Sequence, residues 1–226
     1  MNKVPVITID GPSGSGKGTV SRAVARALGW RLLDSGALYR LVALAARTAG
    51  VGLDDGSGLA RLAHELDLQF DSDAAGEEIV RLDGEAVTAA IRTEEAGNDA
   101  SKVAAQPVVR AALLERQRRF AVPPGLVADG RDMGTVVFPD AELKIFLTAS
   151  AEERAARRYK QLKEKGVAAT LAALSLEIAE RDRRDTNRAI SPLVASADAV
   201  LLDTTGMSVE EVIERVLALA RRRTSN

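Results

Sequence analysis

The sequence predicts an α/β fold in which helices flank a five-stranded parallel sheet, and three observations lead to it. Short apolar runs alternate with stretches of helical period along most of the chain, which is the order of elements around a parallel sheet. A glycine-rich loop, residues 11–19, lies between the first apolar run and the first helical stretch. Between residues 59 and 104, short strand-like runs and turns interrupt this order, which indicates an insertion.

The expected elements follow from the apolar pattern. Sheet strands are expected at 4–9, 31–33, 126–129, 143–147 and 200–202, and helices at 20–28, 38–49, 107–116, 151–165, 171–185 and from 209 onward. Gly29 can end the first helix, while Ser150 and Ser208 each precede a glutamate with capping-box spacing. In the insertion we expect helices at 59–66 and 93–103. Two small strands, 68–71 and 79–83, should flank an acidic, glycine-bearing turn.

These elements suggest a core with one inserted subdomain. We assign residues 1–58 and 105–226 to the core and residues 59–104 to the insertion. Within the core, residues 154–188 are rich in arginine and lysine on both sides of Gly166. A basic helical segment broken by glycine is suited to a lid that closes over a charged ligand and excludes water.

Composition narrows the classes of function. The 226 residues are 46% hydrophobic and 28% charged, as in globular proteins, and the net charge of −1 gives no overall field that favours a nucleic-acid polymer. The chain has no cysteine and one histidine, His64, which argues against thiolate chemistry, triad hydrolysis and two-histidine metal sites. With no signal-like or membrane-spanning apolar stretch, we expect a cytoplasmic protein without membrane partners.

The glycine-rich loop predicts a phosphate-binding site. Glycines allow backbone N–H groups to point inward, the helix start adds partial positive charge, and Lys17 can reach the β- and γ-phosphates of a nucleotide. A flexible linker is the alternative, but a strand before the loop and a helix after it favour the cradle. The hydroxyl that usually follows the lysine is displaced by one residue, to Thr19. The expected ATP-binding residues are Gly11, Pro12, Ser13, Gly14, Ser15, Gly16, Lys17, Gly18 and Thr19, with Arg157 from the basic segment.

Two strand ends should add polar groups at the same edge of the sheet, where α/β proteins bind ligands. Asp129 ends a buried strand and resembles a Walker-B carboxylate, so with Thr19 it is our candidate for contact with Mg²⁺, mainly through water. Asp34, Ser35, Tyr39 and Arg40 follow the second strand and are placed for substrate; for Ser35, a helix N-cap is an equal alternative.

A second phosphate-binding set is expected near the end of the basic segment. Arg181, Asp185 and Arg188 follow i, i+4, i+7 spacing and would share one helix face. A solvated, ion-paired surface is the alternative. A kinase with a phosphate acceptor must bring two polyanions together, however, and arginines offset their repulsion.

Four blocks of sequence closely resemble the bacterial cytidylate kinases, within the nucleoside monophosphate kinase fold. They are residues 9–14 (IDGPSG), 33–40 (LDSGALYR), 129–139 (DGRDMGTVVFP) and 181–185 (RDRRD), of which the third is the most specific. The resemblance covers essentially the whole chain and implies a P-loop kinase with an inserted nucleoside-monophosphate-binding subdomain and a helical lid. It also implies transfer of the γ-phosphoryl group of MgATP to CMP or dCMP by a monomer.

The resemblance also implies roles for individual residues. Ser101, Arg110 and Asp132 would face the cytosine, and Arg181 and Asp185 the sugar. The acceptor phosphate would be surrounded by Ser35, Tyr39, Arg40, Arg131 and Arg188, with Lys17 between donor and acceptor. The residues expected to act on the transferring group are therefore Lys17, Arg131, Arg181 and Arg188. A carboxylate with an arginine matches the donor and acceptor pattern of cytosine and mispairs with uracil.

Two other readings stay open from the sequence. One is a P-loop kinase for a different acceptor, either UMP or a small hydroxylated metabolite. The hydroxyl of such a metabolite would need a base such as Asp34 or Asp129 to accept its proton. The other is a P-loop nucleotide switch, against which the chain lacks an N-K-x-D sequence for reading guanine.

Overall fold

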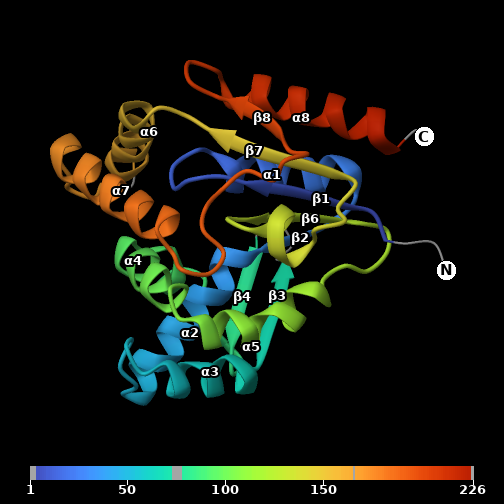
Figure 1. Ribbon diagram of the computed structural model, residues 1–226. Helices are drawn as coiled ribbons and strands as arrows, with labels where there is room; N and C mark the ends of the chain where they lie inside the picture. The colour runs from blue at the N-terminus through green and yellow to red at the C-terminus, as the bar shows by residue number, and fades with distance from the viewer. Residues whose placement is uncertain (1–3, 73–77, 165, 225–226) are drawn as a thin grey trace. The chain divides into compact units, whose positions relative to one another are not determined.

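The computed structural model describes residues 4–72, 78–164 and 166–224 (Figure 1). The chain divides into two compact units, one formed by residues 1–34 with 117–226 and the other by residues 35–116. Each unit is described by itself below. Among the residues described, no helix has both the length and the apolar character needed to cross a bilayer.

The first unit is built on a five-stranded, all-parallel sheet. Its strands are β1 (Val6–Asp10), β2 (Arg31–Asp34), β6 (Leu126–Gly130), β7 (Leu143–Thr148) and β8 (Val200–Asp203), in the order β2-β6-β1-β7-β8. Central strand β1 pairs with β6 and β7, so that Ile9 lies opposite Asp129 on one side and Ile145 on the other. The predicted α/β fold with five parallel strands is confirmed.

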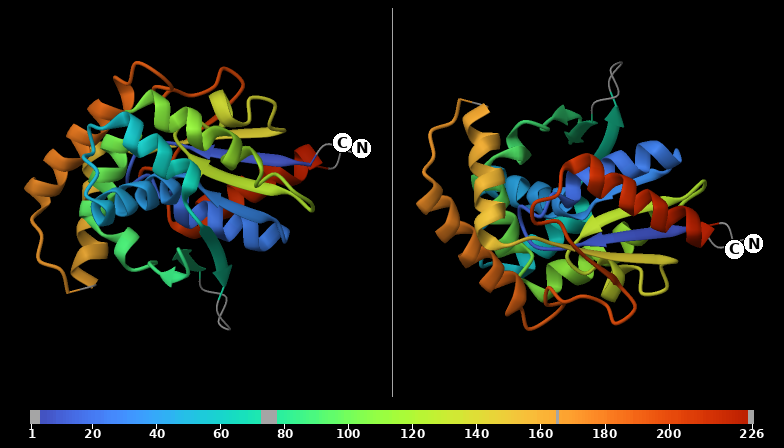
Figure 2. Two further views of the ribbon diagram at one scale, coloured as in Figure 1. Left: turned by 90° about the horizontal axis from the view of Figure 1, so that it is seen from below. Right: turned by 90° about the horizontal axis from the view of Figure 1, so that it is seen from above.

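Helices α1 (Lys17–Leu28) and α8 (Val209–Thr224) cover one face of this sheet (Figure 2). Alternate β1 residues Ile7 and Ile9 join Val24 of α1 and Val216 of α8 in one buried apolar cluster. The ends of both helices follow the predicted chemistry. Gly29 ends α1 in the left-handed conformation, and Ser208 and Glu211 form a reciprocal capping box at the start of α8.

The other alternate residues of β1 meet a short helix that was not predicted. This π-helix, η2 (Met133–Val137), directly follows strand β6 and contacts both β1 and β6. Thr8 and Asp10 on β1 are buried polar residues, and backbone amides of η2 bond to Asp10. The sequence DGRDMGTVV therefore forms a strand end, a turn and a helix within nine residues.

Two highly charged helices, α6 (Ala151–Glu164) and α7 (Leu171–Thr186), lie side by side in the same unit (Figure 1). Ser150 caps α6 by accepting from the Glu153 amide, and Thr170 caps α7 by accepting from the Ala173 amide. These helices contain most of the predicted lid segment, whose bounds and motion remain a prediction.

The second unit combines helices with a small antiparallel sheet. Its elements are α2 (Ser35–Ala49), α3 (Gly56–Glu65), β3 (Leu68–Ser72), β4 (Glu78–Leu82), β5 (Glu85–Ala86), η1 (Ala90–Arg92), α4 (Glu94–Val103) and most of α5 (Pro107–Arg118). The two expected strands pair as β3 and β4, while the expected turn falls on residues 73–77, outside the described residues. Helix α2 begins at Ser35, three residues before the predicted start. The bounds 59–104 for the insertion remain a prediction.

We expect Ile9→Ala to destabilise the protein by about 2–5 kcal/mol, because the side chain is fully buried in the central strand and its removal leaves a cavity. The matched control is Leu201→Ala on edge strand β8, where the side chain is 67% exposed; there we expect a change within about 0.5 kcal/mol. Denaturant unfolding followed by circular dichroism measures both. An equal loss of unfolding free energy in the two variants would contradict the placement of Ile9 in the core.

Candidate active site

The glycine-rich loop forms a closed turn between β1 and α1. Gly11, Gly14 and Gly16 have φ angles of +154°, +76° and +86°, in the region that favours glycine. A Cβ at Gly11 would lie 2.1 Å from the backbone oxygen of Leu147, so no other residue fits there. Lys17 opens α1, and its ammonium donates to the backbone oxygen of Pro12 at 3.0 Å. This is the cradle that the sequence predicted, with the lysine folded across the loop.

Charged groups surround the Lys17 ammonium. Burial and then the positive charge of Arg131 lower the pKa of Lys17, while Asp129 and Asp185 act in the opposite direction. A lysine held among other cations is stabilised in its charged form when an anion arrives. The surroundings of Lys17 thus favour the binding of an anion next to its ammonium group.

The residues available to a divalent cation are few. Asp129 is buried at the end of β6, and a Cβ built on Gly18 would lie 3.2 Å from its Oδ2 atom, which places this carboxylate beside the loop. Thr19 is exposed in the first turn of α1. Within the described ranges there is no group of three histidine, cysteine or acidic side chains suited to holding a metal. One carboxylate and one hydroxyl fit Mg²⁺, which usually keeps several waters and takes phosphate oxygens as ligands.

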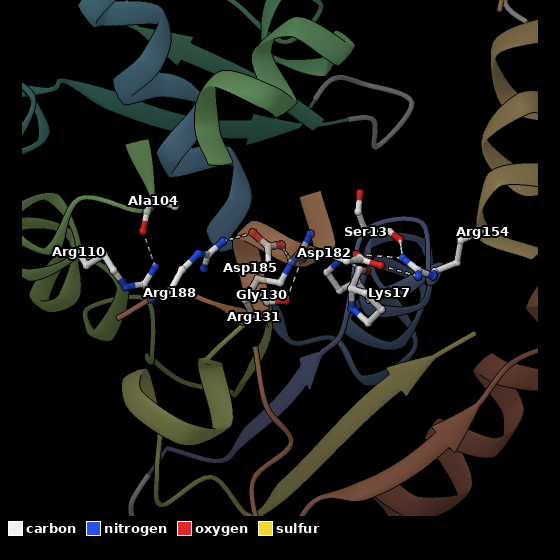
Figure 3. A network of polar contacts seen from close by, with 11 residues as sticks. Ser13, Lys17, Ala104, Arg110, Gly130, Arg131, Arg154, Asp182, Asp185 and Arg188 are labelled. Carbon is white, nitrogen blue, oxygen red and sulfur yellow. Dashed lines mark hydrogen bonds and ion pairs between the residues drawn. The ribbon is translucent and has the colours of Figure 1, made fainter. Parts of the chain in front are cut away.

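Asp185 gathers two arginines next to this loop. It is 1% exposed, accepts from Arg131 Nε at 2.8 Å, and forms a second ion pair with Arg188 (Figure 3). Burial raises the pKa of Asp185, but the two guanidinium groups outweigh it and lower the pKa to about 2. Two cations therefore share one permanently ionised carboxylate.

The spacing argument for this cluster is partly confirmed. Helix α7 ends at Thr186, so Arg188 lies just beyond it instead of on its face, yet still reaches Asp185. Arg181 has a charge that acts on both Lys17 and Asp185. Arg131, which comes from the turn after β6, is 54 positions away from Asp185 in the chain. The structure thus brings together the four residues expected to act on the transferring group.

Two arginines of α6 attach this helix to the rest of the unit. Arg157 donates to the backbone and hydroxyl oxygens of Thr204, and its Nη1 lies 4.0 Å from a Cβ built on Gly16 of the loop. Arg154 is buried and donates both to the backbone oxygen of Ser13 and to the Asp182 carboxylate (Figure 3). Arg157 was expected beside the ATP site. Arg154 was not, although its spacing of three residues from Arg157 puts both on one helix face.

The remaining predicted acceptor residues of the first unit lie in the turn after β6. Asp132 is 3% exposed and immediately precedes η2. Sequence reasoning missed Asp10, whose carboxylate binds the backbone of this same turn. A signal was present: an acidic residue ends a strand whose other residues, apart from Thr8, are all apolar.

The other predicted acceptor residues belong to the second unit. Ser35 and Tyr39 are buried on α2, Ser101 is buried on α4, and Arg110 comes from α5. Arg110 lies over the Tyr39 ring at 5.6 Å from its centroid and donates to the backbone oxygen of Ala104. Arg40 lines a cavity of about 230 Å³. Tyr39 and Arg110 are thus brought together, and the assignment of these residues to CMP remains a prediction.

The fold and the loop define the class of protein: a parallel α/β sheet whose first strand leads through a phosphate cradle into a helix, as in the P-loop phosphotransferases. The comparisons then specify the family. Residues 7–222 match the family model described as cytidylate kinase. The chain belongs to the cytidylate kinase family.

Relatives cover nearly the whole chain. A cytidylate kinase of Marinomonas sp. (strain MWYL1) is 60% identical over 218 residues, with 96% of each chain covered. One from Pseudomonas savastanoi pv. phaseolicola is 63% identical over 217 residues, covering 96% of this chain and 95% of the relative. A solved shikimate kinase from Acinetobacter baumannii is more distant, at 17% identity and a TM-score of 0.44, with 97% of this chain and 94% of that chain covered.

We expect Asp185→Asn to destabilise the protein by about 3–5 kcal/mol at pH 7, because Arg131 and Arg188 lose their shared counter-charge. A carboxyl with a lowered pKa contributes stability above its unfolded value of 3.8, and loses it as the pH falls toward 2. The difference between wild type and variant should therefore be constant from pH 7 to about 4 and shrink below that. Unfolding curves across this range test it; a difference that grows on acidification would contradict the ion-pair assignment.

Proposed function

We propose that this chain transfers the γ-phosphoryl group of ATP to CMP or dCMP, giving ADP and CDP or dCDP. The observation that carries the proposal is the cluster of Lys17, Arg131 and Asp185-bound Arg188 beside the phosphate loop. The loop alone serves the phosphates of one nucleotide. Further guanidinium groups next to it are what a second phosphate, on the acceptor, requires.

The transfer needs no general base. The second pKa of a phosphate monoester is about 6, so the acceptor oxygen is already ionised at pH 7 and can attack the γ-phosphorus directly. This agrees with the composition, because the chain has one histidine, His64, and its side chain on α3 is exposed. The residues supply position and charge. Lys17 and the arginines bind the equatorial oxygens, where negative charge gathers in the transition state.

Mg²⁺ bound with ATP would neutralise phosphate charge, and Asp129 and Thr19 are the residues that would hold it, largely through water. The position of the Asp129 carboxylate at the end of β6, beside the loop, supports this proposal. Closure of α6 and α7 over the nucleotides would exclude water from the transfer.

The choice of base is assigned to Asp132 in the first unit and to Ser101 and Arg110 in the second. Cytosine offers an amino donor and acceptors at N3 and O2, so a carboxylate and an arginine pair with it. Uracil reverses the pattern at positions 3 and 4 and would leave both side chains mispaired. In a site built for hydrogen bonds, such mispairing lowers kcat/KM for UMP by several orders of magnitude relative to CMP.

A panel of acceptors with MgATP tests the proposal. CMP and dCMP should be phosphorylated far better than UMP, GMP, AMP or small hydroxylated metabolites, as followed by ADP release. Preferred use of UMP or of a metabolite would refute the assignment of the acceptor. Turnover of nucleoside triphosphate without any acceptor would instead favour a nucleotide switch.

Lys17→Ala should lower kcat for CMP phosphorylation by about 100-fold or more, since it removes a donor to the transferring group, and should leave the fold intact. Circular dichroism and a coupled assay measure the two effects. Lys160→Ala, an exposed lysine on α6, is the control and should keep wild-type activity. Undiminished turnover by the Lys17 variant would show that the loop is not the donor site.

Asp132→Ala should reduce the ratio of kcat/KM for CMP to that for UMP at least about tenfold, because the amino group of cytosine loses its acceptor. The KM for ATP should change little. Asp140→Ala, which removes an exposed aspartate from the same unit, should leave the ratio unchanged. An unaltered ratio in the Asp132 variant would count against its role in base selection.

A further inference from the structure

Asp10 stands out among the buried charges because the proposed chemistry makes no use of it. It ends β1, directly before the glycine-rich loop, and is 6% exposed. Its two carboxylate oxygens each accept one backbone N–H of the turn after β6: Oδ1 from Met133 at 2.9 Å and Oδ2 from Gly134 at 2.8 Å. One side chain thus binds two successive amides that lie more than 120 positions further along the chain.

These two amides belong to the first two residues of η2. The first N–H groups of a helix have no partner within it, and an aspartate at the N-cap position usually accepts from one of them. Asp132 occupies that position, but its side chain makes no capping hydrogen bond. Asp10 therefore accepts, from β1, the Gly134 amide that an N-cap aspartate at position 132 could bind, and it also accepts the Met133 amide.

Close packing holds the turn in the same place. A Cβ on Gly134 would lie 2.9 Å from the Thr8 hydroxyl, so η2 rests directly against β1. A Cβ on Gly130 would lie 2.7 Å from the Met133 side chain, which folds back over the strand end. Both glycines allow a close approach that fixes the backbone on either side of Arg131 and Asp132.

The carboxylate is kept in this position against an electrostatic cost. The pKa of Asp10 is raised to about 7, mainly by burial; the two amide hydrogen bonds lower it, and the charges of Asp132 and Asp129 add to the rise. An apolar residue would avoid this cost but would leave two amides without an acceptor.

We propose that Asp10 is a positioning residue for base selection: by capping η2 in place of Asp132, it leaves the Asp132 carboxylate oriented toward the base of the acceptor nucleotide. This inference rests on the proposed function and adds to it a residue that touches neither substrate. It assigns selectivity for the acceptor partly to the strand that leads into the donor's phosphate loop.

Asp10→Asn is the discriminating variant, since it keeps the shape of the side chain. An amide has one acceptor oxygen and one donor nitrogen, so one of the two N–H groups would face a donor. Asp132 is then the carboxylate next to the uncapped amides, and we expect it to turn back toward them. The CMP to UMP ratio of kcat/KM should fall about tenfold, with a raised KM for CMP and a KM for ATP within twofold of wild type.

A double-mutant cycle separates this role from a merely structural one. If Asp10 acts through Asp132, then Asp10→Asn should not lower the ratio further in an Asp132→Ala background. Asp55→Asn is the matched control, because Asp55 also caps a helix, α3, by accepting a backbone N–H, and it lies in the other unit. It should leave the ratio at its wild-type value.

Amide hydrogen exchange provides a readout independent of turnover. In the wild type, the backbone amides of Met133 and Gly134 should be protected from exchange. In Asp10→Asn, at least one of these two amides should exchange at least about tenfold faster, while the exchange of the β7 amides stays unchanged. Unchanged exchange at both amides, an unchanged ratio in Asp10→Asn, or an equal drop in both backgrounds of the cycle would each overturn the inference. A wild-type chain with no preference for CMP would contradict the proposed function itself. Failure of the proposed function is therefore seen in the wild type, and failure of the inference about Asp10 is seen in the variants.

Discussion

The site depends on one electrostatic constraint: the cations needed to bind phosphate must stay together while phosphate is absent. Lys17, Arg131, Arg181 and Arg188 carry like charges in a partly buried region, and their repulsion would separate them without a counter-charge. Asp185 supplies it by binding two of the guanidinium groups at once, and Asp129 acts on Lys17. The cations are therefore already in place, and the substrates of the proposed function would add anions to this preorganised set.

The parallel sheet is what allows this concentration of charge. All five strands run in the same direction, so the carboxyl ends of β1 and β6 lie next to each other at one edge. The phosphate loop leaves β1 there, and the turn with Arg131 and Asp132 leaves β6. Asp10 and Asp129 are the last or nearly the last residues of these two strands. In the proposed function, donor binding, acceptor binding and the contacts that align the two would therefore meet at adjacent strand ends.

Local patterns predicted the elements well because each depends on neighbouring residues. Five apolar runs predicted the five sheet strands, and glycine spacing with a strand and a helix on either side predicted the phosphate cradle. Helical spacing linked Arg181, Asp185 and Arg188. The contacts of Asp10 with Met133 and Gly134, of Arg131 with Asp185, and of Arg154 with Ser13 could not be predicted in this way, because they join residues 54 to 141 positions apart. For Ser101 and Arg110, nothing but resemblance to a family pointed to a role.

In the proposed function, two anionic nucleotides meet end to end, one held by the phosphate loop and the other by the arginine cluster. A bisubstrate compound, adenosine and cytidine joined by five phosphates, measures this directly by calorimetric titration. If both sites are engaged at once, it should bind at least about 100-fold more tightly than ATP or CMP alone. Binding no tighter than that of ATP would mean that a second nucleotide site does not face the first, and would contradict the end-to-end arrangement of the two nucleotides.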